Sequence, residues 1–223
     1  MTARRSFLAR FGAAAAAFGL GSSTAGAQSP SPAPPAPAAP HPDPRWQPVR
    51  EAKDDWLDQI PGKHRLFFDA VSAEGAAAAL RYAENFFTGN KDGYGLEASD
   101  VAVVICLRHR ATQFAFTDAI WGKHGAALSE SDKFVDPKTS QAPIVNVYRA
   151  ALEAHVKRGV HFAVCNLATH RLANALARKA DANADAIYKE LTANAFGNAH
   201  FVPAGIVTVN RAQERGYAVA STG

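Results

Sequence analysis

Apolar runs and helical patterns alternate along the chain from about Trp46 onward. This alternation is typical of a parallel sheet whose strands are joined by helices. Five short segments rich in apolar and β-branched residues are predicted strands: residues 66–71, 101–107, 160–165, 200–202 and 217–220. The segment 101–107 is apolar at every position, which indicates a central strand covered on both faces.

The residues between these strands have the pattern of amphipathic helices. The first predicted helix begins after Ser72 as N-cap, carries Ala76, Leu80, Ala83 and Phe87 on one face, and ends at Gly89-Asn90. The other predicted helices run through Phe116, Ile120 and Trp121; from Val145 through Val156 to Gly159; from a cap at Asn166 or Thr169, with a break at 181–185; and over 206–215. The polar stretch 129–143 is the longest predicted loop and is either a lid or part of a subunit interface.

The first 27 residues are predicted to be a cleaved signal peptide. A basic start is followed by the apolar run 11–20 and by Ala25-Gly26-Ala27. The sequence Arg4-Arg5-Ser6-Phe7-Leu8 resembles the twin-arginine export signal. We therefore expect export of the folded protein to the periplasm, and no membrane anchor after cleavage, because the run is too short to span a bilayer.

Proline dominates residues 28–48, which hold nine of the 13 prolines of the chain, and predicts a disordered or polyproline linker. Residues 49–223 are then the folded domain. Cleavage after Ala27 removes three arginines and no acid, so the net charge falls from +4 to +1. A nearly neutral surface gives no electrostatic reason to expect nucleic-acid binding.

The candidate functional residues follow the ends of three predicted strands. Ligands of open parallel sheets bind at the carboxyl ends of the strands. Arg108-His109 follows the second strand, Cys165-Asn166 the third, and Pro203-Ala204-Gly205 the fourth. The dipole of the following helix favours the thiolate of Cys165, which is the candidate nucleophile. His109 or His170 could serve as its base or cationic partner. Arg108, Asn166 and Gly205 are the candidate ligand-binding residues, and an anion is the ligand that suits Arg108.

The same residues could instead have structural roles without any reactivity. Cys165 could equally be a small unreactive residue at the end of a strand. Cys106 is expected to be an unreactive residue of the core. A Cys106–Cys165 disulfide would need neighbouring strands and both side chains on one face. Arg108 could instead pair with an acid such as Asp118. Eight histidines raise the question of a metal, but none has metal-ligand spacing, so no metal site is predicted.

Three groups of segments carry a family resemblance: Gly159–Asn166; Val202–Gly205 with Gln213–Tyr217; and Arg108–Thr112 with Asp118–Trp121 and Pro61–His64. They resemble the DsrE/DsrF-like proteins, of which the best-studied members are sulfur carriers, and the last group resembles exported members. The resemblance covers about residues 56–221. It implies a three-layer α/β/α sandwich with a mainly parallel five-stranded sheet, commonly assembled into trimers or hexamers.

Together these observations predict a periplasmic protein that handles a sulfur species or another small ligand, and the resemblance implies a version in which Cys165 is a persulfide carrier. Relay members of the family work in the cytoplasm, whereas this chain carries an export signal and a proline linker. The alternative is a non-catalytic oligomeric binding or scaffolding module in which Cys165 is buried and inert. The sequence points to no particular cofactor.

Overall fold

The computed structural model describes residues 47–223. The predicted signal peptide and nearly all of the predicted linker therefore lie outside the described residues. Residues 47–223 form one unit. Its main elements are α1 (Trp56–Gln59), β1 (His64–Ala70), α2 (Ala73–Tyr94), β2 (Val101–Leu107), the 3-10 helix η3 (His109–Ala115), α3 (Asp118–Asp132), α4 (Arg149–Lys157), β3 (His161–Cys165), α5 (Asn166–Ala180), α6 (Ala184–Ala193), β4 (Ala199–Val202), α7 (Gly205–Glu214) and β5 (Ala218–Thr222).

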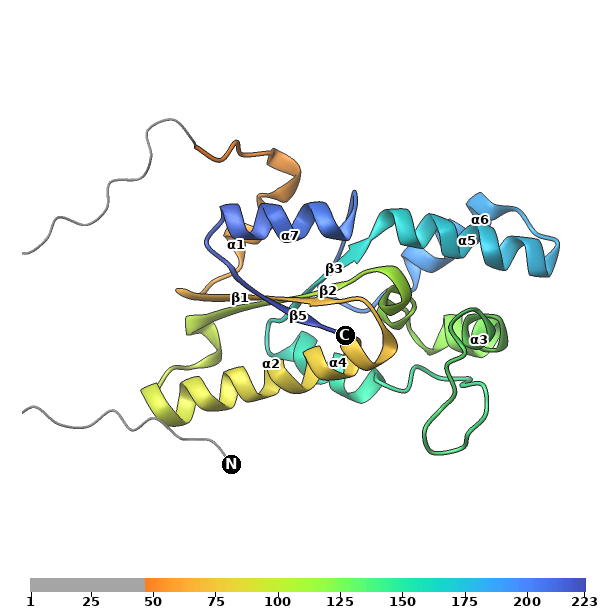
Figure 1. The fold of residues 1–223 in the computed structure, drawn as a ribbon, viewed down its shortest axis with the longest axis horizontal. Coiled ribbons are helices and arrows are strands. Elements are labelled where there is room, and N and C mark those ends of the chain that lie inside the picture. The colour runs from red at the N-terminus through yellow and green to blue at the C-terminus, as the bar shows by residue number, and fades with distance from the viewer. Residues whose placement is uncertain (1–46) are drawn as a thin grey trace, which may run out of the picture. The chain divides into compact units, whose positions relative to one another are not determined.

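All five predicted strands are present and form one parallel sheet in the order β4-β3-β2-β1-β5. The apolar segment 101–107 is the central strand β2, and every one of its residues is buried. Figure 1 shows α2 and α4 on one face of the sheet and α1 and α7 on the other, with α3, α5 and α6 beyond the ends of the strands. The fold is therefore an α/β three-layer sandwich, as predicted.

The two faces of the sheet have cores of different size. The face under α2 and α4 holds the larger core, which includes Phe68, Ile105 and Phe162 and extends to Trp121 in α3. The face under α1 and α7 holds a smaller one around Phe67, Val104 and Tyr217. Alternate residues of the strands supply the two cores, which is why β2 is apolar throughout. Cys106 and Ala163 belong to the α7 face.

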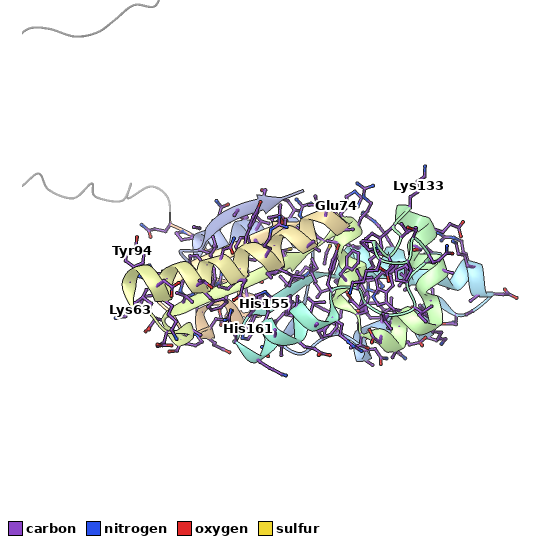
Figure 2. All side chains as sticks on the ribbon, turned by 90° about the horizontal axis from the view of Figure 1, so that it is seen from below. Lys63, Glu74, Tyr94, Lys133, His155 and His161 are labelled. Carbon is purple, nitrogen blue, oxygen red and sulfur yellow. The ribbon has the colours of Figure 1, made fainter. Side chains whose placement is uncertain are left out.

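The first long helix differs from the prediction at its end. Ser72 caps it as expected, with its side chain accepting a hydrogen bond from Gly75, but α2 continues past Gly89 to Tyr94. Figure 2 shows this helix unbroken from near Glu74 to Tyr94. Gly89 is exposed and costs only about 1 kcal/mol in a helix, which the packing of the opposite face offsets. The chain turns instead at Gly95, whose φ is 68°.

The stretch between β2 and β3 is also less regular than predicted. Phe116 forms an isolated bridge to Ala195 rather than lying in a helix, and α3 extends to Asp132, so the loop begins later than residue 129. Val145 and Tyr148 precede α4. Asn146 explains this, because its amide donates to the carbonyls of Phe114 and Phe116 and holds the segment in a non-helical path.

Among residues 47–223, no helix combines the length and apolarity needed to cross a membrane.

Candidate functional site

Three strand ends meet at one hollow of about 280 Å³, which we call the edge hollow. Its lining residues are Arg108, His109, Cys165, Leu167, Ala168, Arg171, Ala204, Gly205 and Ile206. They come from the residues that follow β2, from the start of α5 after β3, and from the start of α7 after β4. The hollow therefore lies at the carboxyl edge of the sheet, where the sequence predicted a site.

Cys165 is the last residue of β3 and the N-cap of α5. It is 8% exposed, and its sulfur is a free thiol. Its carbonyl accepts a hydrogen bond from Thr169 at 3.0 Å, which fixes the first turn of the helix around it. The unpaired N–H groups of that turn give the N-terminal end of α5 a partial positive charge. Cys165 thus lies where an anion beside the helix would be stabilised.

Arg108 is held by Asp69, not by Asp118. Its Nε and Nη2 donate to the two carboxylate oxygens of Asp69 at 2.6 and 2.8 Å, and this hydrogen-bonded pairing raises the pKa of Arg108. Asp118 pairs with Arg149 at 2.6 Å. Asp69 is 5% exposed and lies in register with Cys106, so the sheet itself places its carboxylate next to the residues that follow β2. Two nitrogens of Arg108 are therefore used inside the protein rather than on a ligand.

His109 is exposed and has a φ of 54°, in the left-handed region that non-glycine residues seldom occupy. The next amide, of Arg110, donates to the carbonyl of Val71 at 3.2 Å and holds this turn against the end of β1. The turn directs the chain from β2 into η3 and leaves His109 at the wall of the edge hollow. Of the histidines predicted to serve Cys165, His109 is the one that lines the hollow.

His170 and Asn166 do not line the edge hollow. The ring of His170 stacks on Tyr188 of α6, with centroids 4.0 Å apart and planes at 4°. The side-chain oxygen of Asn166 accepts a hydrogen bond from the same tyrosine at 2.8 Å. Both residues thus join α5 to α6, a structural role that the sequence gave no sign of.

The structure has no disulfide between Cys106 and Cys165; both are free and buried. Cys106 is in register with Ala163, two residues before Cys165. The two cysteines share a face but are diagonal neighbours, which places their Cα atoms about 8 Å apart for ordinary strand spacing and rise. A disulfide needs less than about 7 Å. Burial, and next the charge of Asp69, raise the pKa of the Cys106 thiol well above its usual value.

Gly205 is required by close packing at the floor of the edge hollow. A Cβ atom there would lie 2.7 Å from Cβ and 2.8 Å from Cδ of Arg108, and 3.0 Å from Sγ of Cys106. The first turn of α7 can therefore approach β2 only because residue 205 has no side chain.

We expect Gly205→Ala to lower the free energy of unfolding by about 2 kcal/mol, because the methyl group must push α7 away from Arg108. Gly89→Ala is the matched control, since nothing lies within 4 Å of its Cβ and alanine favours a helix, so it should stabilise by about 0.5 to 1 kcal/mol. Urea unfolding of both variants measures the difference. Equal changes in the two variants would contradict the packing argument.

A pair of histidines lies on the α7 face of the sheet, near the start of β3. Nδ1 of His161 lies 2.8 Å from Nε2 of His200, and Trp56 of α1 stacks on His200 with centroids 3.9 Å apart. Burial lowers the pKa of both histidines, and with the charge of His161 it lowers that of His200 to about 4. Within the described part of the chain, no group of three or more His, Cys, Asp or Glu side chains could hold a metal ion.

We expect the protein to lose stability as the pH falls from about 6.5 toward 4. The folded-state pKa of His200 lies below its unfolded value, so its contribution is complete above about 6.5 and is lost on acidification. Because the ring is only half-buried, the loss should be on the order of 2 kcal/mol. Urea unfolding at pH 7 and 4.5 tests this. His200→Gln should reduce the pH dependence, whereas the exposed His64→Gln should not; equal pH dependence in all three proteins would refute it.

The sequence did not single out Leu167, Arg171 and Ile206, which also line the edge hollow. The available signal was helical spacing: Leu167 and Arg171 are four residues apart and so share a face of the helix that begins at Cys165. The loop 133–143 contributes no residue to the hollow.

No family profile and no curated protein matches the chain. Among solved structures, it is similar to a protein of unknown function, MTH1491 from Methanobacterium thermoautotrophicum. The identity is 12% and the TM-score 0.41, over 71% of this chain and 99% of that one. These comparisons assign no function to the edge hollow.

Proposed function

We propose that the protein is an exported sulfur carrier in which Cys165 accepts a sulfane sulfur as a persulfide and passes it on. The observation that carries the proposal is the position of Cys165: a free thiol at the N-terminal end of α5 that lines the edge hollow beside Arg108 and His109. The resemblance of Gly159–Asn166 to the cysteine-ending strand of DsrE/DsrF-like proteins supports the same role. The twin-arginine pattern at Arg4-Arg5 supports a periplasmic location, and the family resemblance a trimer or hexamer.

The transfer is an exchange at sulfur without net oxidation. The Cys165 thiolate attacks the outer sulfur of a donor persulfide, R–S–SH; the S–S bond of the donor breaks, and R–S⁻ leaves. The product is Cys165–S–SH, and the same exchange with an acceptor thiolate returns Cys165 as a thiolate. His109 can take the proton of the thiol before the attack, and the N-terminal end of α5 stabilises the anionic sulfur.

A second function, a binding module with an inert cysteine, is favoured by two observations. Cys165 is only 8% exposed, and Arg108 already binds Asp69 with two nitrogens. In this case the edge hollow would hold an anion without reacting with it.

Intact mass measurement separates the two functions. The folded mature protein is incubated with cysteine persulfide, freed of small molecules, and weighed under native and denaturing conditions. A carrier gains the mass of one sulfur atom on the peptide that contains Cys165, and native mass gives the oligomer. An unchanged mass together with two thiols that are alkylated only after unfolding would overturn the carrier proposal and favour the binding module.

A further inference from the structure

The edge hollow has a basic group that no acidic residue within the described range 47–223 neutralises. None of its nine lining residues is acidic. Arg108 is paired with Asp69, but Arg171, which is exposed, forms no ion pair or hydrogen bond within residues 47–223. A guanidinium in this situation can bind a carboxylate through two parallel hydrogen bonds. The wall of the hollow thus provides a site for a carboxylate.

Arg171 lies on α5, beyond the N-terminal end at which Cys165 is the N-cap. It is six residues further along the chain, so its Cα is about 9 Å along the axis of α5 from the N-cap. Long side chains on a helix lean toward its N-terminus, and Arg171 reaches the hollow in this way. A ligand with its sulfur at Cys165 and its carboxylate at Arg171 therefore needs several bonds between the two groups.

Apolar side chains flank the path between Cys165 and Arg171. Leu167 of α5 and Ile206 of α7 line the hollow and are 53% and 59% exposed, so together they present apolar surface to a ligand. An alkyl chain that covered them would remove apolar surface from water. The volume of about 280 Å³ is close to the lower limit of about 300 Å³ for small-molecule pockets, so the hollow suits a small ligand.

We propose that the sulfur donor of this site is a low-molecular-weight organic persulfide that carries a carboxylate several bonds from its sulfur. Arg171 selects the carboxylate, and Leu167 and Ile206 contact the alkyl chain between the two groups. This inference rests on the function proposed above, and the sulfur transfer is the same exchange, in which the donor leaves as its thiolate. Arg171 is a specificity residue and takes no part in the exchange itself.

Two donors that differ only in charge test the inference: the persulfides of 6-mercaptohexanoate and of 6-mercaptohexanamide. The rate at which Cys165 of the mature protein gains sulfur is followed by intact mass. We expect the acid to load about tenfold faster than the amide, as for one charged hydrogen-bonded pair. The ratio should shrink at high salt.

Matched variants assign the preference to Arg171. Arg171→Gln should reduce the ratio of the two rates to about one. Arg178→Gln removes the same charge from an exposed position two turns further along α5, outside the edge hollow, and should keep the ratio. Ile206→Ser should slow both donors about threefold, whereas Val207→Ser, also exposed but outside the hollow, should not.

The results distinguish failure of the inference from failure of the proposed function. If Cys165 is loaded by both donors at equal rates, the carrier function stands and the carboxylate inference is overturned. The inference is also overturned if both arginine variants lose the preference equally, because the selection then depends on overall charge. If neither donor loads Cys165 while cysteine persulfide does, the carrier function stands and the inference is overturned. If cysteine persulfide also leaves the mass unchanged, the proposed function fails and the inference fails with it.

Discussion

Replacing Cys165 with serine should abolish sulfur uptake completely. A serine hydroxyl keeps its proton at neutral pH and does not exchange with a persulfide, so no sulfur can be held at this position. The fold should survive, because the two side chains are similar in size and residue 165 lies at the wall of a hollow. Incubation with cysteine persulfide followed by intact mass measures the effect.

Cys106→Ala is the control, and it should load as well as the unchanged protein. Cys106 is fully buried, and burial raises the pKa of its thiol, so the thiolate needed for exchange is disfavoured. The substitution leaves a small void and should cost about 1 kcal/mol of stability. If sulfur were still gained by the Cys165→Ser variant, or were lost from the Cys106→Ala variant, Cys106 would be the carrier and the proposed function would be wrong in its central residue.

The sheet and the place of the site could be predicted from sequence because they depend on local pattern. The apolar run 101–107 is typical of a strand covered on both faces, and the carboxyl ends of parallel strands lie at the same edge of the sheet. These two patterns were enough to predict that Arg108, His109, Cys165 and Gly205 lie at one edge of the sheet, and all four line the edge hollow. The helix predicted over 206–215 is also present, as α7.

Partners distant in sequence could not be predicted, because many candidates satisfy the same chemistry. The sequence offers many acidic residues that could pair with Arg108. Only the register of β1 against β2 selects Asp69, which is 39 residues away along the chain. His170 was assigned to the site because it lies one turn into the helix after Cys165. In the structure the His170 ring stacks on Tyr188 instead of lining the edge hollow. This stacking depends on how α6 packs on α5, which no local sequence pattern specifies. Arg171 was missed for the converse reason: its interest lies in forming no ion pair with any residue in the part of the chain that the structure describes, and a sequence does not show which charges are unpaired.

The edge hollow combines a closely packed interior with an exposed rim. Asp69, Arg108 and Gly205 are packed together, with the paired carboxylate and guanidinium held by the sheet and covered by α7. Arg171, Leu167 and Ile206 are exposed at the rim and free to meet a ligand. Substitutions in the interior should therefore change stability, whereas those at the rim should change which donor is used.

Arg108→Met should lower the free energy of unfolding by about 3 kcal/mol. It removes both hydrogen bonds to Asp69 and leaves a carboxylate that is 5% exposed without its cation, which is far more costly than the loss of a surface pair. Arg149→Met is the matched control. The ion pair of Arg149 with Asp118 is equally short, 2.6 Å, but more than half of the Arg149 side chain is exposed, so its loss should cost less than about 1 kcal/mol.

A double-mutant cycle shows whether the cost comes from the abandoned carboxylate. Asp69→Leu combined with Arg108→Met replaces both charges by apolar groups, and we expect the pair to be at least 1 kcal/mol more stable than Arg108→Met alone, because no buried charge is left unpaired. Urea unfolding of the two single variants, the double variant and Arg149→Met provides the comparison. If Arg108→Met costs no more than Arg149→Met, the Asp69–Arg108 pair behaves as a surface pair, and the stability of the edge hollow must come from apolar packing around Gly205 instead.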